Sequence, residues 1–87
     1  MKLVTESQIR GSFRGWKGHS VYKLINGEYW KQSKYVYYYH YAYQPKVKIW
    51  QDGSTYYLEV EGINDKLEVR KASSSDWNEY QKEEGDN

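Results

Sequence analysis

Apolar and polar residues alternate with a period of two along much of the chain, which is typical of β-strands with one buried face. The clearest case is the pair of segments Lys46–Gln51 and Ser54–Val60, which flank Asp52-Gly53. Asp-Gly between such segments indicates a two-residue hairpin, pairing residue 51 with 54, 49 with 56 and 47 with 58. One face of this hairpin then carries the apolar residues Val47, Ile49, Tyr56, Leu58 and Val60.

A second hairpin is predicted at Asn26-Gly27, between segments 21–25 and 29–32. A strict two-residue turn would place Trp30 on the face opposite Tyr22 and Leu24, so we expect a longer, bulged loop. Further strands are expected over residues 8–16 and 66–71. The expected core comprises Ile9, Phe13, Tyr22, Leu24, Trp30, Val47, Ile49, Tyr56, Leu58, Val60, Leu67 and Val69.

The 87-residue chain is short enough to form one domain. Five or six short strands over residues 8–72 predict an all-β fold: a small antiparallel barrel, Src-homology-3-like (SH3-like) or oligonucleotide-binding-like. Residues 1–7 are expected to be a flexible leader. Residues 73–87 are expected to form an acidic, mobile tail, although Trp77 and Tyr80 have the spacing of a short docked helix.

Residues 35–43 are unusually rich in tyrosine, at six of nine positions. A buried phenol needs a hydrogen-bond partner, so most of these rings should keep one edge in water. In an extended segment the odd-numbered residues share one face. We therefore expect an aromatic stripe that lines a groove or braces the barrel, formed by Tyr35, Tyr37, Tyr39, Tyr41 and Tyr43.

Three stretches of the sequence form a distinctive set: a Gly-Trp-x-Gly turn at residues 15–18, an Asn-Gly hairpin before a Trp-x-Gln at residues 26–32, and a Tyr/His-rich segment ending in Pro-x-Val at residues 35–47. In these stretches the chain resembles a family of small uncharacterised bacterial β domains. The resemblance covers residues 8–71 and implies a β fold and a bacterial origin. It implies no particular activity.

Charge is distributed unevenly along the chain. Residues 1–72 hold 12 Lys and Arg against 7 Asp and Glu, whereas residues 73–87 hold 1 against 5. This asymmetry favours a polyanionic or acidic partner, and an ordinary soluble surface with a solvated tail is the alternative. Cysteine is absent, which excludes disulfides and cysteine-type zinc sites. The polar N-terminal segment and the lack of a long apolar run predict a cytoplasmic protein with no membrane partner.

Catalytic chemistry finds little support in the sequence. His19 and His40 have no neighbouring nucleophile motif, and two separated histidines do not make a metal site. Glu59 and Glu61 alternate onto one strand face, where carboxylates are usually solvated. No glycine-rich loop ends in Gly-Lys-Ser/Thr. We therefore expect no enzyme activity, no cofactor and no metal.

Binding is the better supported class of function. Tyrosine and tryptophan dominate protein interfaces, so an aromatic surface predicts a protein or peptide partner, or self-association. The alternative is single-stranded nucleic acid, held by a basic and aromatic barrel face. The candidate binding residues are Trp16, Tyr35, Tyr37, Tyr39, His40, Tyr41, Tyr43, Lys46, Lys48, Trp50 and Tyr57.

Overall fold

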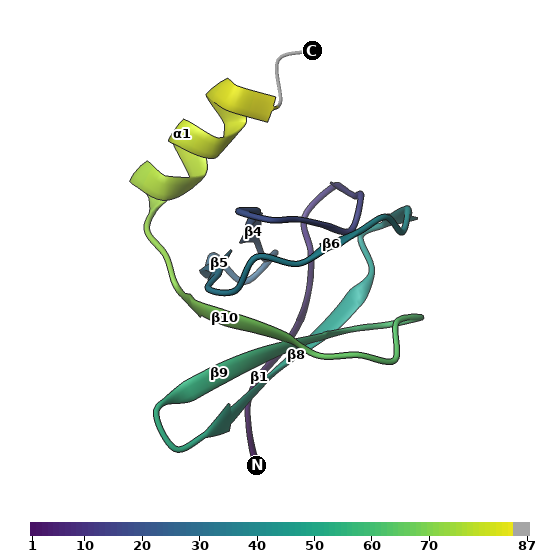
Figure 1. Cartoon of the computed structure of the whole chain (residues 1–87), viewed down its shortest axis with the longest axis vertical. Coiled ribbons are helices and arrows are strands. Elements are labelled where there is room, and N and C mark those ends of the chain that lie inside the picture. The colour runs from purple at the N-terminus through teal and green to yellow at the C-terminus, as the bar shows by residue number, and fades with distance from the viewer. Residues whose placement is uncertain (85–87) are drawn as a thin grey trace.

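The computed structural model describes residues 1–84, which form ten strands and one helix (Figure 1). The elements are β1 (Lys2–Gln8), β2 (Ser12–Phe13), β3 (Trp16–Lys17), β4 (Val21–Lys23), β5 (Tyr29–Gln32), β6 (Tyr37–Tyr38), β7 (Ala42–Tyr43), β8 (Lys46–Asp52), β9 (Thr55–Val60), β10 (Leu67–Lys71) and α1 (Ser74–Glu84). Six strands build one antiparallel sheet in the order β1-β8-β9-β10-β5-β4. β2 pairs with β7, and β3 pairs with β6.

The prediction of an antiparallel β domain is confirmed for the six-stranded sheet, but the fold is not purely β because α1 follows β10. Figure 1 shows α1 at the end of the molecule opposite the N-terminus. No closed barrel is detected among residues 1–84. An isolated antiparallel bridge between Ile9 and Leu24 nevertheless connects the chain just after β1 to the chain just after β4.

The expected core is confirmed. All the residues proposed for it are buried except Tyr56, which is partly buried and packs against the others. Trp16, Val21 and Ile63 are buried in addition. Trp16 was expected on a binding surface, yet its side chain is only 3% exposed and its ring packs against Phe13.

The β8–β9 hairpin has the predicted faces but not the predicted register. Ile49 pairs with Leu58 and Asp52 with Thr55, so the turn residues are Gly53-Ser54 rather than Asp52-Gly53. Of these two, only Gly53 has a positive φ, of 64°, which is the pattern of a type II′ turn with glycine at its first central position. The register differs by two residues, so every side chain keeps its face.

The second hairpin has the bulged loop that the sequence predicted. Tyr22 pairs directly with Trp30, and the Leu24 amide donates to the Glu28 carbonyl at 2.9 Å. Gly27 closes the loop with a φ of 93°, and its amide donates to the Leu24 carbonyl. The extra loop residues bring Tyr22, Leu24 and Trp30 into the same core.

Both ends of the described chain form regular secondary structure. Instead of a leader, Lys2–Gln8 forms β1, which pairs with β8 along its length. Its ordering depends on main-chain pairing, because its apolar side chains Leu3 and Val4 are exposed. In the predicted acidic tail, Ser74–Glu84 forms α1, the short helix for which Trp77 and Tyr80 have the spacing; the remainder of the tail lies outside the described residues. Ser73 and Asp76 start the helix with reciprocal hydrogen bonds, a capping-box arrangement.

Candidate functional site: a groove beside the tyrosine segment

Residues 35–43, the tyrosine segment, form an irregular ladder with residues 11–18. Phe13 pairs with Ala42, whereas Trp16 pairs with Tyr38. The chain advances three residues on one side and four on the other, so the tyrosine segment contains one extra residue between the two pairs. A one-residue change of register moves side chains to the other face of a strand. The segment therefore does not present one continuous alternating stripe.

Glycine permits the close approach of the two segments. Gly15 has a φ of 93°, and a Cβ atom there would overlap the carbonyl oxygen of Tyr38. Gly18 also has positive φ, and its missing side chain leaves room for the Tyr35 ring. The Gly18 amide donates to the Val36 carbonyl at 3.1 Å. These glycines let the tyrosine backbone pack directly onto the chain around β3.

The buried amide of Gln32 anchors the start of the tyrosine segment. Its side chain is 4% exposed and lies at the end of β5. Its Oε1 accepts from the amides of Lys17 and Ser20, both at 3.1 Å. Its Nε2 donates to the carbonyls of Lys34 and Val36, also at 3.1 Å. One side chain thus joins the turn after β3 to the backbone that leads into β6.

All six tyrosine side chains of the segment are exposed, from 49% at Tyr38 to 78% at Tyr35. The expectation of one continuous stripe on the odd-numbered face is therefore wrong, because the extra residue between Tyr38 and Ala42 breaks the alternation. His40, expected on the surface, is partly buried. Its ring centroid lies 6.4 Å from that of Phe13, so it packs on the core.

A groove of about 510 Å³ lies beside the tyrosine segment. Tyr37 and Tyr38 line it together with Tyr57 of β9 and the connection 62–68. The buried ring of Trp16 also lines it and meets Tyr38 edge-on, with centroids 5.8 Å apart and planes 78° apart. The structure thus gathers four aromatic side chains around one concave surface.

The indole N–H of Trp16, a residue that lines this groove, has no hydrogen-bond partner among residues 1–84. The indole nitrogens of Trp30 and Trp50 donate to Glu28 and Glu59, at 3.0 and 2.6 Å. Trp16 has no such partner within residues 1–84. Its indole nitrogen is nevertheless not fully enclosed, because Ser7 Oγ is the one enclosed side-chain nitrogen or oxygen atom without a partner in these residues. A buried aromatic donor normally finds a partner, so this N–H is suited to water or a ligand.

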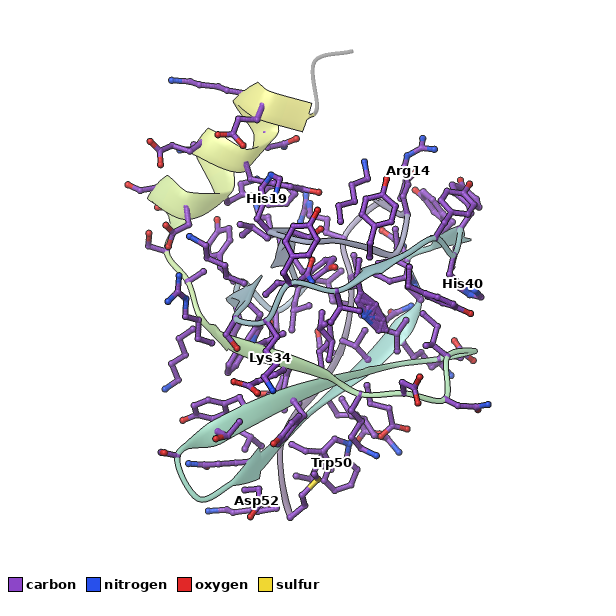
Figure 2. All side chains as sticks on the ribbon, viewed as in Figure 1. Arg14, His19, Lys34, His40, Trp50 and Asp52 are labelled. Atoms are coloured by element: carbon purple, nitrogen blue, oxygen red, sulfur yellow. The ribbon has the colours of Figure 1, made fainter. Side chains whose placement is uncertain are left out.

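The predicted basic and aromatic face on β8 is charge-balanced by glutamates. Lys48 stands opposite Glu6 on one side and Glu59 on the other. The hollow around Lys46 and Lys48 is also lined by Glu6, Glu59 and Glu61, so its carboxylates outnumber its lysines. Figure 2 shows Trp50 at the end of the molecule far from Arg14 and His40. Trp50 pairs directly with Tyr57, which lines the groove, but Trp50 itself does not line it.

Two positions matter that the list of candidate binding residues missed. Tyr38 was placed on the face opposite the odd-numbered tyrosines by strict alternation, yet it lines the groove together with Tyr37. Gln32 could have been found from its sequence, because it shares the inward face of β5 with Trp30. Residues 62–65, which precede the predicted strand 66–71, carried no signal in the sequence beyond their turn residues.

The structure also shows where His19 lies and whether the described residues could hold a metal ion or form a membrane-spanning helix. His19 lies beside α1, with its Nε2 3.5 Å from Glu83 Oε1. Within the described part of the chain, no three His, Cys, Asp or Glu side chains come together in a way that could hold a metal ion. The one helix found there is too short and too polar to cross a membrane.

Comparisons of the chain with protein-family models, with curated proteins and with solved structures find no match.

Proposed function

We propose that this protein is a non-catalytic binding module that recognises an extended, proline-rich peptide of a partner protein in the groove formed by Trp16, Tyr37, Tyr38 and Tyr57. The observation that carries the proposal is the gathering of these four aromatic side chains around one groove of about 510 Å³. A volume of this size is within the range of ligand-binding clefts.

The chemistry of the groove suits proline. Aromatic-lined grooves bind polyproline II segments because the peptide is already extended and loses little conformational entropy on binding. Such a peptide has carbonyl groups without internal hydrogen bonds, and the Trp16 indole N–H is a donor for one of them. The rings of Tyr37 and Tyr57 supply stiff apolar area on either side.

The charge of the groove favours a peptide over a nucleic-acid strand. Lys34 and Lys66 line it together with Asp65 and Glu68, so its formal charges cancel. Nucleic-acid binding draws much of its affinity from cations that neutralise phosphates. Lys34 Nζ is already 3.9 Å from Glu68 Oε1. Asp65 is exposed and forms no ion pair within residues 1–84, so it can attract a basic side chain of the peptide.

The proposal includes closure of the sheet into a small SH3-like barrel, which would fix the groove walls relative to one another. The support comes from the junction between the two outer strands of the sheet. The amide of Arg10 donates to the Lys23 carbonyl at 2.8 Å, and that of Ile25 donates to the Gln8 carbonyl at 2.9 Å. These bonds flank the Ile9–Leu24 bridge and remove part of the open edge that a lone sheet would have.

Selection from a phage-displayed library of random peptides tests the proposal. We expect the full chain to enrich proline-containing sequences with one basic residue. Tyr37→Ala should weaken binding of a selected peptide about tenfold, as for an aromatic hot spot. Tyr39→Ala is the matched control, because Tyr39 is 66% exposed, close to the 70% of Tyr37, but does not line the groove.

Two results would overturn the proposal. One is a selection that yields no common sequence. The other is an equal loss of binding in Tyr37→Ala and Tyr39→Ala, which would point to the tyrosine segment as a whole rather than to the groove. Selected peptides rich in Asp and Glu would favour an acidic partner over a proline-rich one.

A further inference from the structure

A second hollow, of about 260 Å³, lies between α1 and the chain around β2, β3 and β4. It is distinct from the peptide groove: of the adjacent residues of β3, Lys17 lines this hollow and Trp16 lines the groove. Four cations line it, and no carboxylate does among the side chains that the structure describes. The cations are Arg10, Arg14, Lys17 and Lys23.

The helix turns its aromatic face toward this hollow. Trp77, Tyr80 and Gln81 line it, and their spacing places them on one side of a helix. The carboxylates Asp76, Glu79 and Glu83 line a separate, smaller hollow with His19 and Lys31. Asp76, Glu79 and Glu83 therefore line a different hollow from Arg10 and Lys23.

Two of the cations lie over aromatic rings that do not themselves line the hollow. The guanidinium carbon of Arg14 lies 5.5 Å from the centre of the Tyr41 ring. Lys23 Nζ lies 5.7 Å from the centre of the Tyr29 ring. Neither cation, nor Arg10, forms an ion pair with a carboxylate in the described chain. Like charges held close together repel one another, and an anion between them relieves that repulsion.

We propose that this hollow binds a small phosphate ester that carries a planar ring, such as a nucleoside monophosphate. Arg10 and Lys23 would neutralise the phosphate, because guanidinium and ammonium groups form charge-assisted hydrogen bonds with phosphate oxygens. The Trp77 ring would pack against the planar group. The volume is slightly below the usual range for drug-sized ligands, which limits the site to a compact molecule or the end of a longer one.

Titration of the full ¹⁵N-labelled chain with adenosine 5′-monophosphate tests this site. At low salt we expect shifts in the indole N–H of Trp77 and in the amides of residues 10–17 and 23. Adenosine, which lacks the phosphate, should cause no such shifts, and inorganic phosphate should bind more weakly than the ester. Equal shifts with adenosine would overturn the role of the cations, and equal affinity for inorganic phosphate would overturn the role of the ring.

The variant Arg10→Gln/Lys23→Gln should weaken binding about tenfold or more, the loss expected when a charge-assisted hydrogen bond is removed. Lys46→Gln/Lys48→Gln is the matched control, since it removes the same charge from the face around β8. An equal loss in the control would show unspecific attraction and overturn the proposal. Should the double variant fail to fold, Arg10→Gln alone provides the same test. Tyr37→Ala should leave nucleotide affinity unchanged, which separates this site from the peptide groove.

Discussion

Replacing Gln32 should detach the tyrosine segment from the rest of the fold. The amide makes four hydrogen bonds, two to backbone N–H groups and two to backbone carbonyls. Gln32→Leu keeps an apolar side chain of similar size but removes all four. The Ser20 amide then loses its partner inside the protein, because Ser20 is fully buried. The Lys17 amide retains the Ser20 hydroxyl at 3.0 Å.

The expected loss follows from these groups. An orphaned buried donor costs about 1–3 kcal/mol, and each carbonyl that loses a hydrogen bond but can still reach water costs about 0.5–1.5 kcal/mol. The unfolding free energy should therefore fall by about 2–6 kcal/mol, a large share of the roughly 5–15 kcal/mol typical of a small domain. Urea denaturation followed by tryptophan fluorescence measures this loss.

Gln32→Glu tests the hydrogen bonds that this side chain accepts separately from those that it donates. A carboxylate can still accept from Lys17 and Ser20, but it cannot donate to the carbonyls of Lys34 and Val36. Burial beside two carbonyl oxygens favours the protonated acid, so folding should raise the pKa of the new side chain. Stability relative to the wild type should then improve as the pH falls, because the protonated form is the one that can donate.

Hydrogen exchange of the Gly18 amide, which is bonded to the Val36 carbonyl, reports the local detachment. We expect faster exchange there in both variants. A loss below about 1 kcal/mol in Gln32→Leu, which is less than one orphaned buried group should cost, would refute the reasoning. So would a Gln32→Glu variant whose relative stability worsens on acidification.

Three further perturbations test the fold. Gly15→Ala should be far more destabilising than Gly11→Ala by urea denaturation: both glycines have positive φ, but only at Gly15 would a Cβ atom meet backbone, whereas Gly11 has open space. The pKa of Asp76 is held below its usual value by the hydrogen bond from the Ser73 amide. Because the ionised form of Asp76 favours the folded state, the helicity of α1 in the wild type should fall as the pH drops through the aspartate range. Asp76→Asn should show a smaller fall by circular dichroism. Burial raises the pKa of Tyr22, whose hydroxyl donates to the Gly15 carbonyl. This contribution to stability is present below about pH 10 and is lost at higher pH, so Tyr22→Phe should flatten the alkaline fall in the urea midpoint.

The core was predictable from the sequence because period-two alternation depends only on which face of each strand is buried. The hairpin at Gly53 shows the limit of that signal. Its register differed by two residues from the prediction, yet Ile49 and Leu58 kept their core positions, since an even shift preserves faces. The bulged loop before Tyr29 was predictable because a strict turn would have exposed Trp30.

The candidate site was less predictable because a register shift by an odd number of residues moves side chains to the opposite face of a strand. One extra residue between Tyr38 and Ala42 interrupts the alternation of the tyrosine segment, and all six of its tyrosines are exposed. No local pattern marks that residue, since it arises from pairing with a segment more than twenty positions away. β1 was missed for a related reason, because its strand depends on hydrogen bonds to β8 and not on a buried face.

The most direct test of the peptide groove is a titration of the ¹⁵N-labelled chain with a short proline-rich peptide carrying one arginine, in parallel with a thymidine oligonucleotide. The account predicts that the peptide shifts the Trp16 indole N–H and the amides of Tyr37, Tyr38 and residues 62–68, while the oligonucleotide leaves them in place. An oligonucleotide that shifts these signals when the peptide does not would contradict the account. So would peptide shifts confined to the face around Trp50.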